Sequence, residues 1–393
     1  MTSSSIGVAV IGAGMAGRAH ANGYRAASTV FGTDLPEIRL VAIADLNAAF
    51  AEDAARRFGF ERTEKTWEAL VDAPDVDAVS VVVANHLHRE IVEALLAAGK
   101  HVLCEKPLAP TSADAQAMVA AAERSDRVAA VGFTFRRSPA INAIRAQVSQ
   151  RHLGAVRHFN GHYWCDYGAD PNAPISWRYR GRPGSGALAD IGSHMVDLSE
   201  FVCGPIAGVQ GAVLATLVGQ RPVPIGTAMG HAGTEVGEER EPVGNEDIAT
   251  FTATFASGAV GTFSVSRVHF GHANALGFEV FCEHGAAAFD LERAAEFTIA
   301  DGMPAAEING YRQVLVGPAH PYIARGLPMD FPSVGHGQND FFVFQARAFL
   351  NAVAGRTDEL PPPPTLAEGL HNMRVLDAVV ASAQAGGAAA TVQ

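Results

Sequence analysis

The chain is poor in cysteine, in basic residues and in long apolar runs. It has 4 cysteines among 393 residues, none at the spacing of a metal-binding pair. A chain of this length can bury a core without disulfide bonds, so we expect free thiols and a cytoplasmic location. No apolar stretch approaches the roughly 20 residues that span a bilayer. The start, Met1–Ile6, lacks the basic and apolar regions of a signal peptide. We expect neither a membrane partner nor a metal site.

Basic residues are also outnumbered. The chain has 41 acidic and 29 basic residues, and its formal net charge is −12. Nucleic acids and anionic membranes are bound by basic faces, so this balance disfavours both as partners. The hydrophobic fraction of 48% and the charged fraction of 18% are typical of a globular protein. The length allows two domains of ~100–200 residues each.

A glycine-rich turn follows the first apolar segment. Residues 7–11 are largely β-branched and predict a buried strand, which leads into GAGMAG at 12–17 and then a helix-forming stretch. This is the order of a dinucleotide-binding turn, in which Gly12 permits the tight turn and Gly14 lets the backbone approach a pyrophosphate. Gly17 lets helix and strand pack closely, and the helix N-terminus attracts phosphate. Glycine-rich turns also occur by chance, so the motif alone is a weak indicator. The cofactor contacts expected here are Gly12, Gly14, Met15 and Ala16.

Asp45 ends the second apolar strand, predicted at 40–44. A carboxylate at this place can accept both hydroxyls of an adenosine ribose, and it would repel a 2′-phosphate. Asp45 therefore favours NAD over NADP. The alternative is that Asp45 only caps the helix predicted at 48–58.

Strands and helices alternate as far as residue 133. Apolar strands are predicted at 77–84, 101–104 and 128–133, with helices at 89–98 and 113–123. Such repeats predict a parallel, doubly wound sheet. The carboxyl edge of such a sheet binds ligands, and we expect Asn85, His88, Glu105 and Lys106 there. Pro107 ends its strand because it has no N–H donor. His86 and His88 could equally be ordinary surface residues.

The pattern changes after residue 137, so we expect a Rossmann domain at 1–137 and an α+β domain at 138–393. Alternating segments between 155 and 300 predict a large, mostly antiparallel open sheet, with one face available to another subunit. A final helix is expected at 366–383, with a frayed Gly/Ala tail after it. The segment 221–245 shows no pattern that we can interpret.

Asp190 and His194 lie four residues apart in a predicted helix. Positions i and i+4 of a helix share a face, so the two side chains can meet. A carboxylate fixes the tautomer of an imidazole and raises its basicity, which suits a general base. Such a pair can also be purely structural. Zinc would need a third ligand, and none stands at a recognisable spacing.

Together these segments resemble the Gfo/Idh/MocA family of oxidoreductases over nearly the whole chain. The resemblance rests on GAGMAG (12–17), NHLH (85–88), AGKHVLCEKPL (98–108), SWR (176–178) and GALADIGSHMVDL (186–198). The segments 169–178 and 317–322 most resemble the levoglucosan dehydrogenase branch, which oxidises the C3 hydroxyl of an anhydrosugar. The chain departs from the family at Val83-Ala84, where Thr-Pro is frequent, and at Thr134, where asparagine is common.

The resemblance implies metal-free, NAD(P)-dependent oxidation of a secondary hydroxyl of a sugar, an anhydrosugar such as levoglucosan, a glycoside or an inositol. It implies that Lys106 lies by the nicotinamide and that Asp190 and His194 lie in the substrate pocket. His194 is then the base, oriented by Asp190, and Lys106 stabilises the alkoxide; alternatively Lys106 is the base. Cofactor contacts are also expected from Asn85, His88, Glu105, Thr134, Trp177 and Arg178. Pocket candidates, each of which could be a surface residue instead, are Trp164, Asp166, Asp170, Arg178, His320 and Tyr322.

Two other functions are compatible with these residues. A redox-elimination glycosidase of the same family would oxidise C3, eliminate across C1–C2 and return the hydride. A non-catalytic NAD and sugar sensor is disfavoured, because Lys106, Asp190 and His194 are all present. By analogy with the fold we expect a homodimer or homotetramer that forms through the sheet of the second domain. The sequence does not name the substrate.

Overall fold

The computed structural model describes residues 5–30, 35–181, 184–226, 235–301, 309–324, 327, 329, 331, 334–356 and 360–393. Contacts between Cα atoms divide the chain into two compact units. Unit 1 comprises 1–137 and 317–370, and unit 2 comprises 138–316 and 371–393. Within the described ranges, no helix has the length and apolarity needed to cross a membrane.

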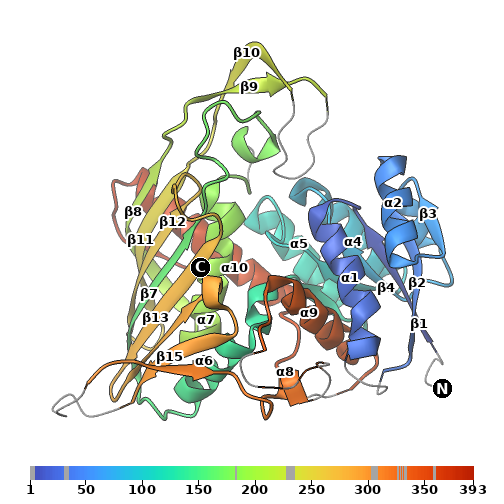
Figure 1. The fold of residues 1–393 in the computed structure, drawn as a ribbon. Helices are drawn as coiled ribbons and strands as arrows, with labels where there is room; N and C mark the ends of the chain where they lie inside the picture. The colour runs from blue at the N-terminus through green and yellow to red at the C-terminus, as the bar shows by residue number, and fades with distance from the viewer. Residues whose placement is uncertain are drawn as a thin grey trace. The chain divides into compact units, whose positions relative to one another are not determined.

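Unit 1 is built on a six-stranded sheet of order β3-β2-β1-β4-β5-β6 (Figure 1). All neighbouring pairs are parallel. The order reverses between β1 and β4, and open α/β sheets bind ligands at such a switch point, outside the carboxyl ends of the strands. The strands are β1 (Ser5–Ile11), β2 (Glu37–Ala44), β3 (Arg62–Glu64), β4 (Ala78–Val81), β5 (His101–Cys104) and β6 (Ala129–Val131).

The helices of unit 1 begin and end where their sequences provide caps. The side chain of Asn47 accepts hydrogen bonds at the start of α2, and Gly59 closes that helix with a φ of +79°. Thr111 caps α5 in the same way. The helices are α1 (Met15–Val30), α2 (Ala48–Phe58), α3 (Glu68–Val71), α4 (His88–Ala97), α5 (Ser112–Glu123), α8 (Pro321–Ala324) and α9 (Gln338–Val353), with 3₁₀ turns η1 (Asn85–Leu87) and η2 (Thr134–Arg137).

Helix α9 explains why residues 317–370 group with unit 1. It packs beside α1, although more than 300 residues separate them in sequence (Figure 1). Gly23 permits the close approach, since a Cβ there would lie 2.6 Å from the carbonyl oxygen of Phe342. We had expected the whole of 138–393 to form one domain. Compact units need not be domains, so the domain boundaries remain a prediction.

Unit 2 is built on a nine-stranded sheet of order β16-β15-β14-β13-β7-β12-β11-β8-β17. All pairs are antiparallel except β7 with β12. The strands are β7 (Val156–Trp164), β8 (Ile206–Ala215), β11 (Ile248–Phe255), β12 (Val260–Ser266), β13 (Ala275–Cys282), β14 (Ala286–Asp290), β15 (Glu296–Ala300), β16 (Arg312–Leu315) and β17 (Ala390–Thr391). The predicted fold class, a parallel Rossmann sheet with a second, mostly antiparallel sheet, is confirmed.

Helices α6 (Pro139–Ser149) and α7 (Ser193–Cys203) pack on each other and on this sheet. Strand β7 alternates, so Phe159, Gly161 and Tyr163 are buried while their neighbours are more exposed. Phe159 is central in the core, with the rings of Phe263 and Phe278 5.5 and 5.4 Å away. Gly161 leaves room for the Met195 sulfur of α7.

Two segments differ from expectation. The Gly/Ala tail is not frayed, because β17 pairs with β8 at the edge of the sheet. The uninterpreted segment 221–245 contributes to an antiparallel pair, β9 (Gln220–Pro224) with β10 (Val236–Pro242), and residues 227–234 lie outside the described ranges. The final helix, α10 (Leu366–Gln384), contains the division between the units at 370/371.

Candidate active site

The glycine turn lies between β1 and α1. Gly12 has a φ of +102°, and a Cβ on it would overlap the carbonyl oxygen of Val82. A Cβ on Gly17 would likewise overlap the oxygen of Gly12, so this glycine lets the helix approach the strand. Gly14 differs, because no heavy atom lies within 4 Å of the place its Cβ would take. The turn is thus closed on protein at two glycines and open at the third, and this fits a pyrophosphate at the start of α1.

Two residues of the turn start helix α1. The side chain of Met15 is 63% exposed, and Ala16 is half-buried. Both are therefore open to a ligand at this helix N-terminus.

Asp45 ties the end of β2 to the glycine turn. Its Oδ2 accepts a hydrogen bond from Ala13 N at 2.7 Å, and its Oδ1 accepts one from Asn47 N at 2.8 Å. Asn47 is the cap of α2, so the alternative role for Asp45 as the helix cap is not supported. Each carboxylate oxygen keeps a further acceptor site for a hydroxyl group. The nearby guanidinium of Arg18 is engaged by Asp53 at 2.8 Å.

His88 supports the carboxyl edge from within. Its ring is 1% exposed, and its nitrogens lie 3.1 Å from the carbonyl oxygens of Leu108 and Val83. Burial lowers the pKa of His88 below its ordinary value, against the raising effect of these carbonyls. Both ring nitrogens are thus directed at the backbone. We expected His88 to contact the cofactor; the structure places it instead between the turn after β4 and the segment after Pro107.

Glu105 and Lys106 follow β5, and the peptide bond between Lys106 and Pro107 is cis. Lys106 is half-buried, whereas Glu105 is 9% exposed and its Oε1 lies 2.9 Å from Nε2 of His20. Burial acts to raise the pKa of Glu105, but the hydrogen bond from His20 and the charge of Lys106 bring it below its ordinary value. The carboxylate therefore faces His20 rather than solvent.

Two further expected cofactor residues lie at this edge. Asn85 is 6% exposed at the start of η1. Thr134 is 3% exposed, and its Oγ1 lies 2.9 Å from Oε1 of Gln345 in α9. The Thr134 hydroxyl is thus directed at α9, which does not support the expected contact with the cofactor.

In unit 2, Asp190 and His194 do not share one regular α-helix. Residues Leu188–Gly192 form a π-helical turn, η4, and α7 begins at Ser193. Asp190 Oδ2 accepts a hydrogen bond from the Tyr167 hydroxyl at 2.8 Å and lies 3.5 Å from Arg178 Nε. The ring of His194 lies 6.1 Å from that of Tyr163. The π-turn changes the spacing on which the predicted pair rests, so the orientation of His194 by Asp190 remains a prediction.

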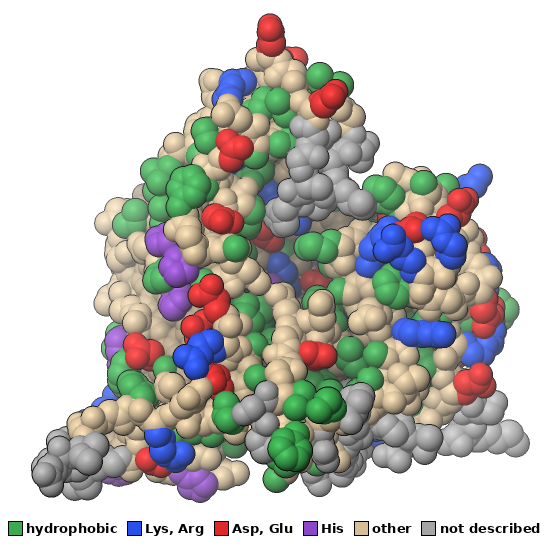
Figure 2. Space-filling view, in the orientation of Figure 1, with side chains coloured by type: hydrophobic (Ala, Val, Ile, Leu, Met, Phe, Trp, Pro, Cys, Tyr) green, Lys and Arg blue, Asp and Glu red, His purple; other side chains and the backbone are tan. Residues whose placement is uncertain are grey.

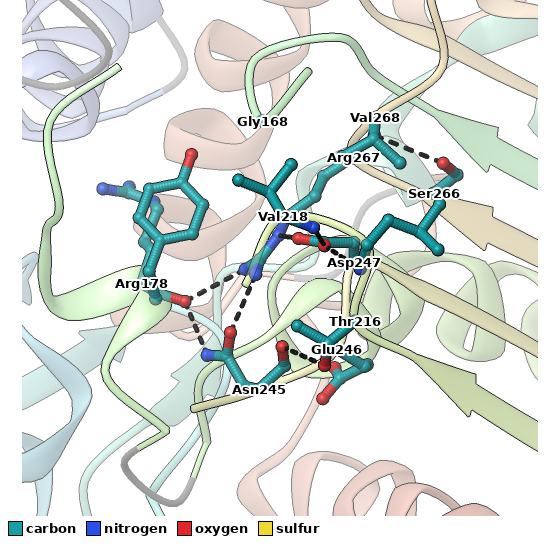
Figure 3. A network of polar contacts seen from close by, with 12 residues as sticks. Gly168, Arg178, Thr216, Val218, Asn245, Glu246, Asp247, Ser266, Arg267 and Val268 are labelled. Carbon is teal, nitrogen blue, oxygen red and sulfur yellow. Dashed lines mark hydrogen bonds and ion pairs between the residues drawn. The ribbon is translucent and has the colours of Figure 1, made fainter. Parts of the chain in front are cut away.

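A buried polar network fixes the backbone of Arg178 (Figure 3). Arg267 donates from Nε to Asp247 at 2.8 Å, from Nη1 to the Arg178 oxygen at 3.0 Å and from Nη2 to Asn245 at 2.8 Å. Asn245 Nδ2 donates to the same Arg178 oxygen at 2.6 Å. The side chains of Arg267 and Asp247 are 0% exposed, so this ion pair is shielded from bulk solvent.

The same network holds the start of the π-turn. Glu246, between Asn245 and Asp247, accepts a hydrogen bond from Leu188 N at 2.8 Å. Its carboxylate occupies the space beside Gly186, where a Cβ would overlap it. The segment 245–247 thus fixes both the Arg178 turn and the residues that lead to Asp190.

Two arginines also hold the irregular loop before η3 (Trp177–Tyr179). The Tyr179 ring lies between the guanidinium groups of Arg221 and Arg267, at 4.0 and 4.4 Å. Arg221 donates to the carbonyl oxygens of Asp170 at 2.8 Å and Gly168 at 2.5 Å. Side-chain donors therefore replace the ladder that a strand would provide. Arg178 stacks on Trp177 at 4.7 Å.

The structure places the other pocket candidates apart. Trp164 stacks between His162 and His269, at 3.9 and 4.8 Å, on the sheet face opposite Tyr163, so it is not brought to His194. Asp166 is half-buried, and Asp170 is exposed, where its Oδ1 accepts from Asn172 N.

His320 and Tyr322 belong to unit 1. Tyr322 is 0% exposed, with its ring 4.7 Å from that of Phe344 and its hydroxyl 3.3 Å from Arg137 Nη1. The His320 ring stacks on it at 5.5 Å. Tyr322 is thus a core residue of unit 1, which does not support its expected role in the pocket.

Sequence reasoning missed Tyr163, Tyr167, Asp247 and Arg267. The only signal was the charge of Asp247 and Arg267 at the ends of apolar, alternating segments. Among the residues that the structure describes, no group of three or more His, Cys, Asp or Glu side chains is placed to hold a metal ion.

Comparisons with known proteins identify the family and the fold. Residues 6–133 match the Gfo/Idh/MocA model described as "Oxidoreductase family, NAD-binding Rossmann fold", and 141–288 match the C-terminal domain model of that family. The chain is 36% identical to levoglucosan dehydrogenase of Pseudarthrobacter phenanthrenivorans, over 96% of each chain. It is 32% identical to glucose-6-phosphate 3-dehydrogenase of Bacillus subtilis over 49% of this chain and 52% of the relative.

Solved structures give the same result over the full length. A levoglucosan dehydrogenase in complex with NADH and levoglucosan matches with a TM-score of 0.89 and 34% identity, over 99% of each chain. An oxidoreductase domain protein from Kribbella flavida matches with a TM-score of 0.89 and 38% identity, over 100% of each chain.

Proposed function

The chain belongs to the Gfo/Idh/MocA family and is an NAD-dependent oxidoreductase, and from this premise we propose that it oxidises the C3 hydroxyl of a sugar or anhydrosugar, with levoglucosan as the first candidate. The observation that carries the proposal is the similarity to levoglucosan dehydrogenase along 96% of both chains. Partial relatives include 1,5-anhydro-D-fructose reductase and D-apiose dehydrogenase. By their names, these relatives all act on a sugar or an anhydrosugar, and we propose the same substrate class for this chain.

The residues of unit 1 fit the cofactor. Bound NAD would supply the hydride acceptor. We assign its pyrophosphate to the turn at Gly12 and Gly14, and its adenosine ribose to Asp45. A 2′-phosphate would meet the Asp45 carboxylate, and the Arg18 guanidinium that could offset this repulsion is already paired with Asp53. This supports a preference for NAD over NADP.

The residues of unit 2 fit proton transfer. We assign His194 as the base that takes the hydroxyl proton, because an imidazole titrates near neutral pH. Asp190 is a fixed anion, held by Tyr167 and Arg178, and its expected effect is to orient His194. Burial and the charge of Asp190 raise the pKa of Tyr167, so this phenol stays a hydrogen-bond donor. Lys106 is assigned to the same substrate, where its charge would stabilise the developing oxygen anion.

The test is NAD⁺ reduction at 340 nm against levoglucosan, monosaccharides, inositols and aryl glycosides, followed by product analysis for the 3-ketone. With the best substrate, His194→Ala should lower kcat about 100- to 10,000-fold. Lys106→Met should lower it about 100- to 1,000-fold. The matched controls are the exposed residues His152 and Lys65, as His152→Ala and Lys65→Met.

Three outcomes would contradict the proposal. Near-normal turnover by Lys106→Met or His194→Ala would refute the assigned roles. Cleavage of a glycoside without net NADH would replace the dehydrogenase with the redox-elimination glycosidase. Binding of NAD without turnover of any compound in the panel would favour the sensor.

We also propose a homodimer or homotetramer that forms through the sheet of unit 2. Val213 and Val260 are 58% and 41% exposed on the side facing away from the core, and histidine side chains are exposed over this sheet (Figure 2). Light scattering after size exclusion should give a mass above that of one chain. Val213→Glu with Val260→Glu should lower that mass, and a monomeric wild type would refute the proposal.

A further inference from the structure

A chain of buried hydrogen bonds inside unit 1 leads to the corner formed by Glu105 and Lys106. Tyr24 Oη lies 2.7 Å from Ser80 Oγ, which lies 3.0 Å from His20 Nδ1. The other ring nitrogen of His20, Nε2, lies 2.9 Å from Glu105 Oε1. Tyr24, Ser80 and His20 are 1%, 0% and 2% exposed. Polar groups of α1, of β4 and of the segment after β5 thus meet in an otherwise apolar interior, which calls for an explanation.

The direction of each hydrogen bond follows from the chemistry of its ends. Glu105 is acceptor-only when ionised, and its pKa lies below its ordinary value despite burial, because of His20 and Lys106. His20 Nε2 therefore donates to it. In the neutral tautomer Nδ1 then accepts, so Ser80 donates to His20 and Tyr24 donates to Ser80. Burial raises the pKa of Tyr24, so its hydroxyl keeps the proton that this arrangement needs.

The Glu105 carboxylate has a hydrogen-bond partner at each oxygen. Its Oε2 accepts a hydrogen bond from the backbone N of Lys106 at 3.1 Å. Cys104 and the buried ring of His88 also feel its charge. Gly132 leaves the space it occupies, since a Cβ there would lie 2.6 Å from Oε1. His20 is thus a side-chain donor to this carboxylate, and Lys106 N is a backbone donor to it.

We propose that His20 is a positioning residue of the reaction, which acts on Lys106 by holding the Glu105 carboxylate as a fixed anion beside it. This rests on the proposed function, because it assumes that Lys106 faces the substrate. An anion next to an ammonium group stabilises the charged form. A charged lysine can stabilise an oxygen anion but cannot remove a proton. Lys106 then steadies the substrate oxygen, and the base is another residue.

The kinetic test uses two replacements of His20. His20→Leu removes the donor, and it should lower kcat about 10- to 100-fold, the worth of a hydrogen bond to a charged group. It should also move the acid limb of the kcat profile to higher pH, because Glu105 then ionises less readily. The NADH dissociation constant, measured by fluorescence, should stay within about twofold, since the removed donor faces Glu105 and not the glycine turn.

His20→Gln and Tyr24→Phe are the matched controls. Glutamine keeps an N–H at the reach of Nε2, so His20→Gln should recover kcat to within about threefold of the wild type. Tyr24→Phe leaves the Ser80, His20 and Glu105 contacts in place and should change kcat less than about twofold. A His20→Gln enzyme as impaired as His20→Leu would overturn the proposal, because ring packing on Phe342 rather than the donor would then matter.

A second measurement does not depend on the substrate. ¹⁵N-histidine NMR of the protein without cofactor, assigned by comparison with His20→Gln, should show a protonated Nε2 and an unprotonated Nδ1 at pH 7. A protonated Nδ1 with a bare Nε2 would overturn the proposal. If the wild type oxidises no compound in the panel, the proposed function fails. The NMR spectrum still decides whether His20 Nε2 donates its hydrogen bond to Glu105.

Discussion

Replacing Arg267 by methionine should destabilise unit 2 by about 3–5 kcal/mol, the cost of removing one partner of a buried ion pair. The structure shows where this cost arises. Arg267 loses a charged hydrogen bond to Asp247 and two bonds to the Arg178 and Asn245 oxygens. The charged bond is worth about 1.5–3 kcal/mol and the other two about 0.5–1.5 kcal/mol each, which together give about 2.5–6 kcal/mol and so include that range. In the variant, Asp247 keeps two hydrogen bonds, because Leu217 N and Val218 N still donate to its Oδ2.

Urea unfolding can be followed in unit 2 alone. Of the three tryptophans, Trp164 and Trp177 lie in unit 2 and Trp67 in unit 1. In a Trp67→Phe background, fluorescence therefore reports unit 2, and its midpoint should fall for Arg267→Met. The matched control is the exposed Arg240, which bonds Asn172 at 2.7 Å. Arg240→Met should cost less than about 0.5 kcal/mol.

The double variant with Asp247→Asn separates the ion pair from general packing. The sum of the losses in unfolding free energy of the two single variants should exceed the loss of the double variant by about 1–3 kcal/mol. The reason is that the effects of replacing two residues in contact are not additive. The KM for the sugar should rise in Arg267→Met, because the backbone of Arg178, an expected pocket residue, loses a donor. A destabilisation of Arg267→Met below about 1 kcal/mol, or strict additivity, would refute the reasoning.

Three further predictions concern unit 1. Asp45→Ser should raise the ratio of NADP to NAD turnover about 10- to 100-fold, because a charge facing the 2′-phosphate is removed; an unchanged ratio would contradict the assignment. Gly14→Val should raise the NADH dissociation constant more than about tenfold without lowering the thermal midpoint, because its Cβ meets no protein atom; a lowered midpoint with normal NADH binding would refute this. Burial, with a smaller effect of His336, lowers the pKa of His320 to about 4 from 6.5. The unfolded chain then takes up its proton first, so stability should fall as the pH drops from 6.5 toward 4. His320→Gln should reduce this fall, as measured by urea midpoints at pH 7 and 5, and equal falls in both proteins would contradict it.

The parts that sequence could predict are those in which local chemistry decides the structure. The glycine turn is an example, since Gly12 and Gly17 each lie where a Cβ would overlap a carbonyl oxygen, Gly14 leaves the turn open between them, and their spacing is fixed along the chain. The end of β5 at Pro107 is another, because the missing N–H acts within its own strand. The carboxyl edge could therefore be placed from sequence.

The directions of side chains could not be predicted in the same way. His88 was expected at the cofactor, but whether its ring faces outward or inward depends on the carbonyl of Leu108, 20 residues later. Trp164 was expected in the pocket, and one step of strand register places it on the opposite face from Tyr163. The π-turn at Leu188–Gly192 has no signal in a pattern that assumes one helical period. Each of these directions depends on a contact that only the folded chain brings together, so whether His88 and Trp164 meet a ligand remains a prediction.

The two buried charge systems share a physical logic. A buried charge often adds no stability compared with apolar residues of the same shape, because it loses its hydration. Yet Arg267 with Asp247 holds the Arg178 backbone, and His20 with Glu105 holds the segment that carries Lys106. Apolar side chains could fill either space, but they could not donate to a fixed oxygen or hold a fixed charge. Stability alone therefore does not explain these residues; under the proposed function, they orient charged groups at the reacting hydroxyl.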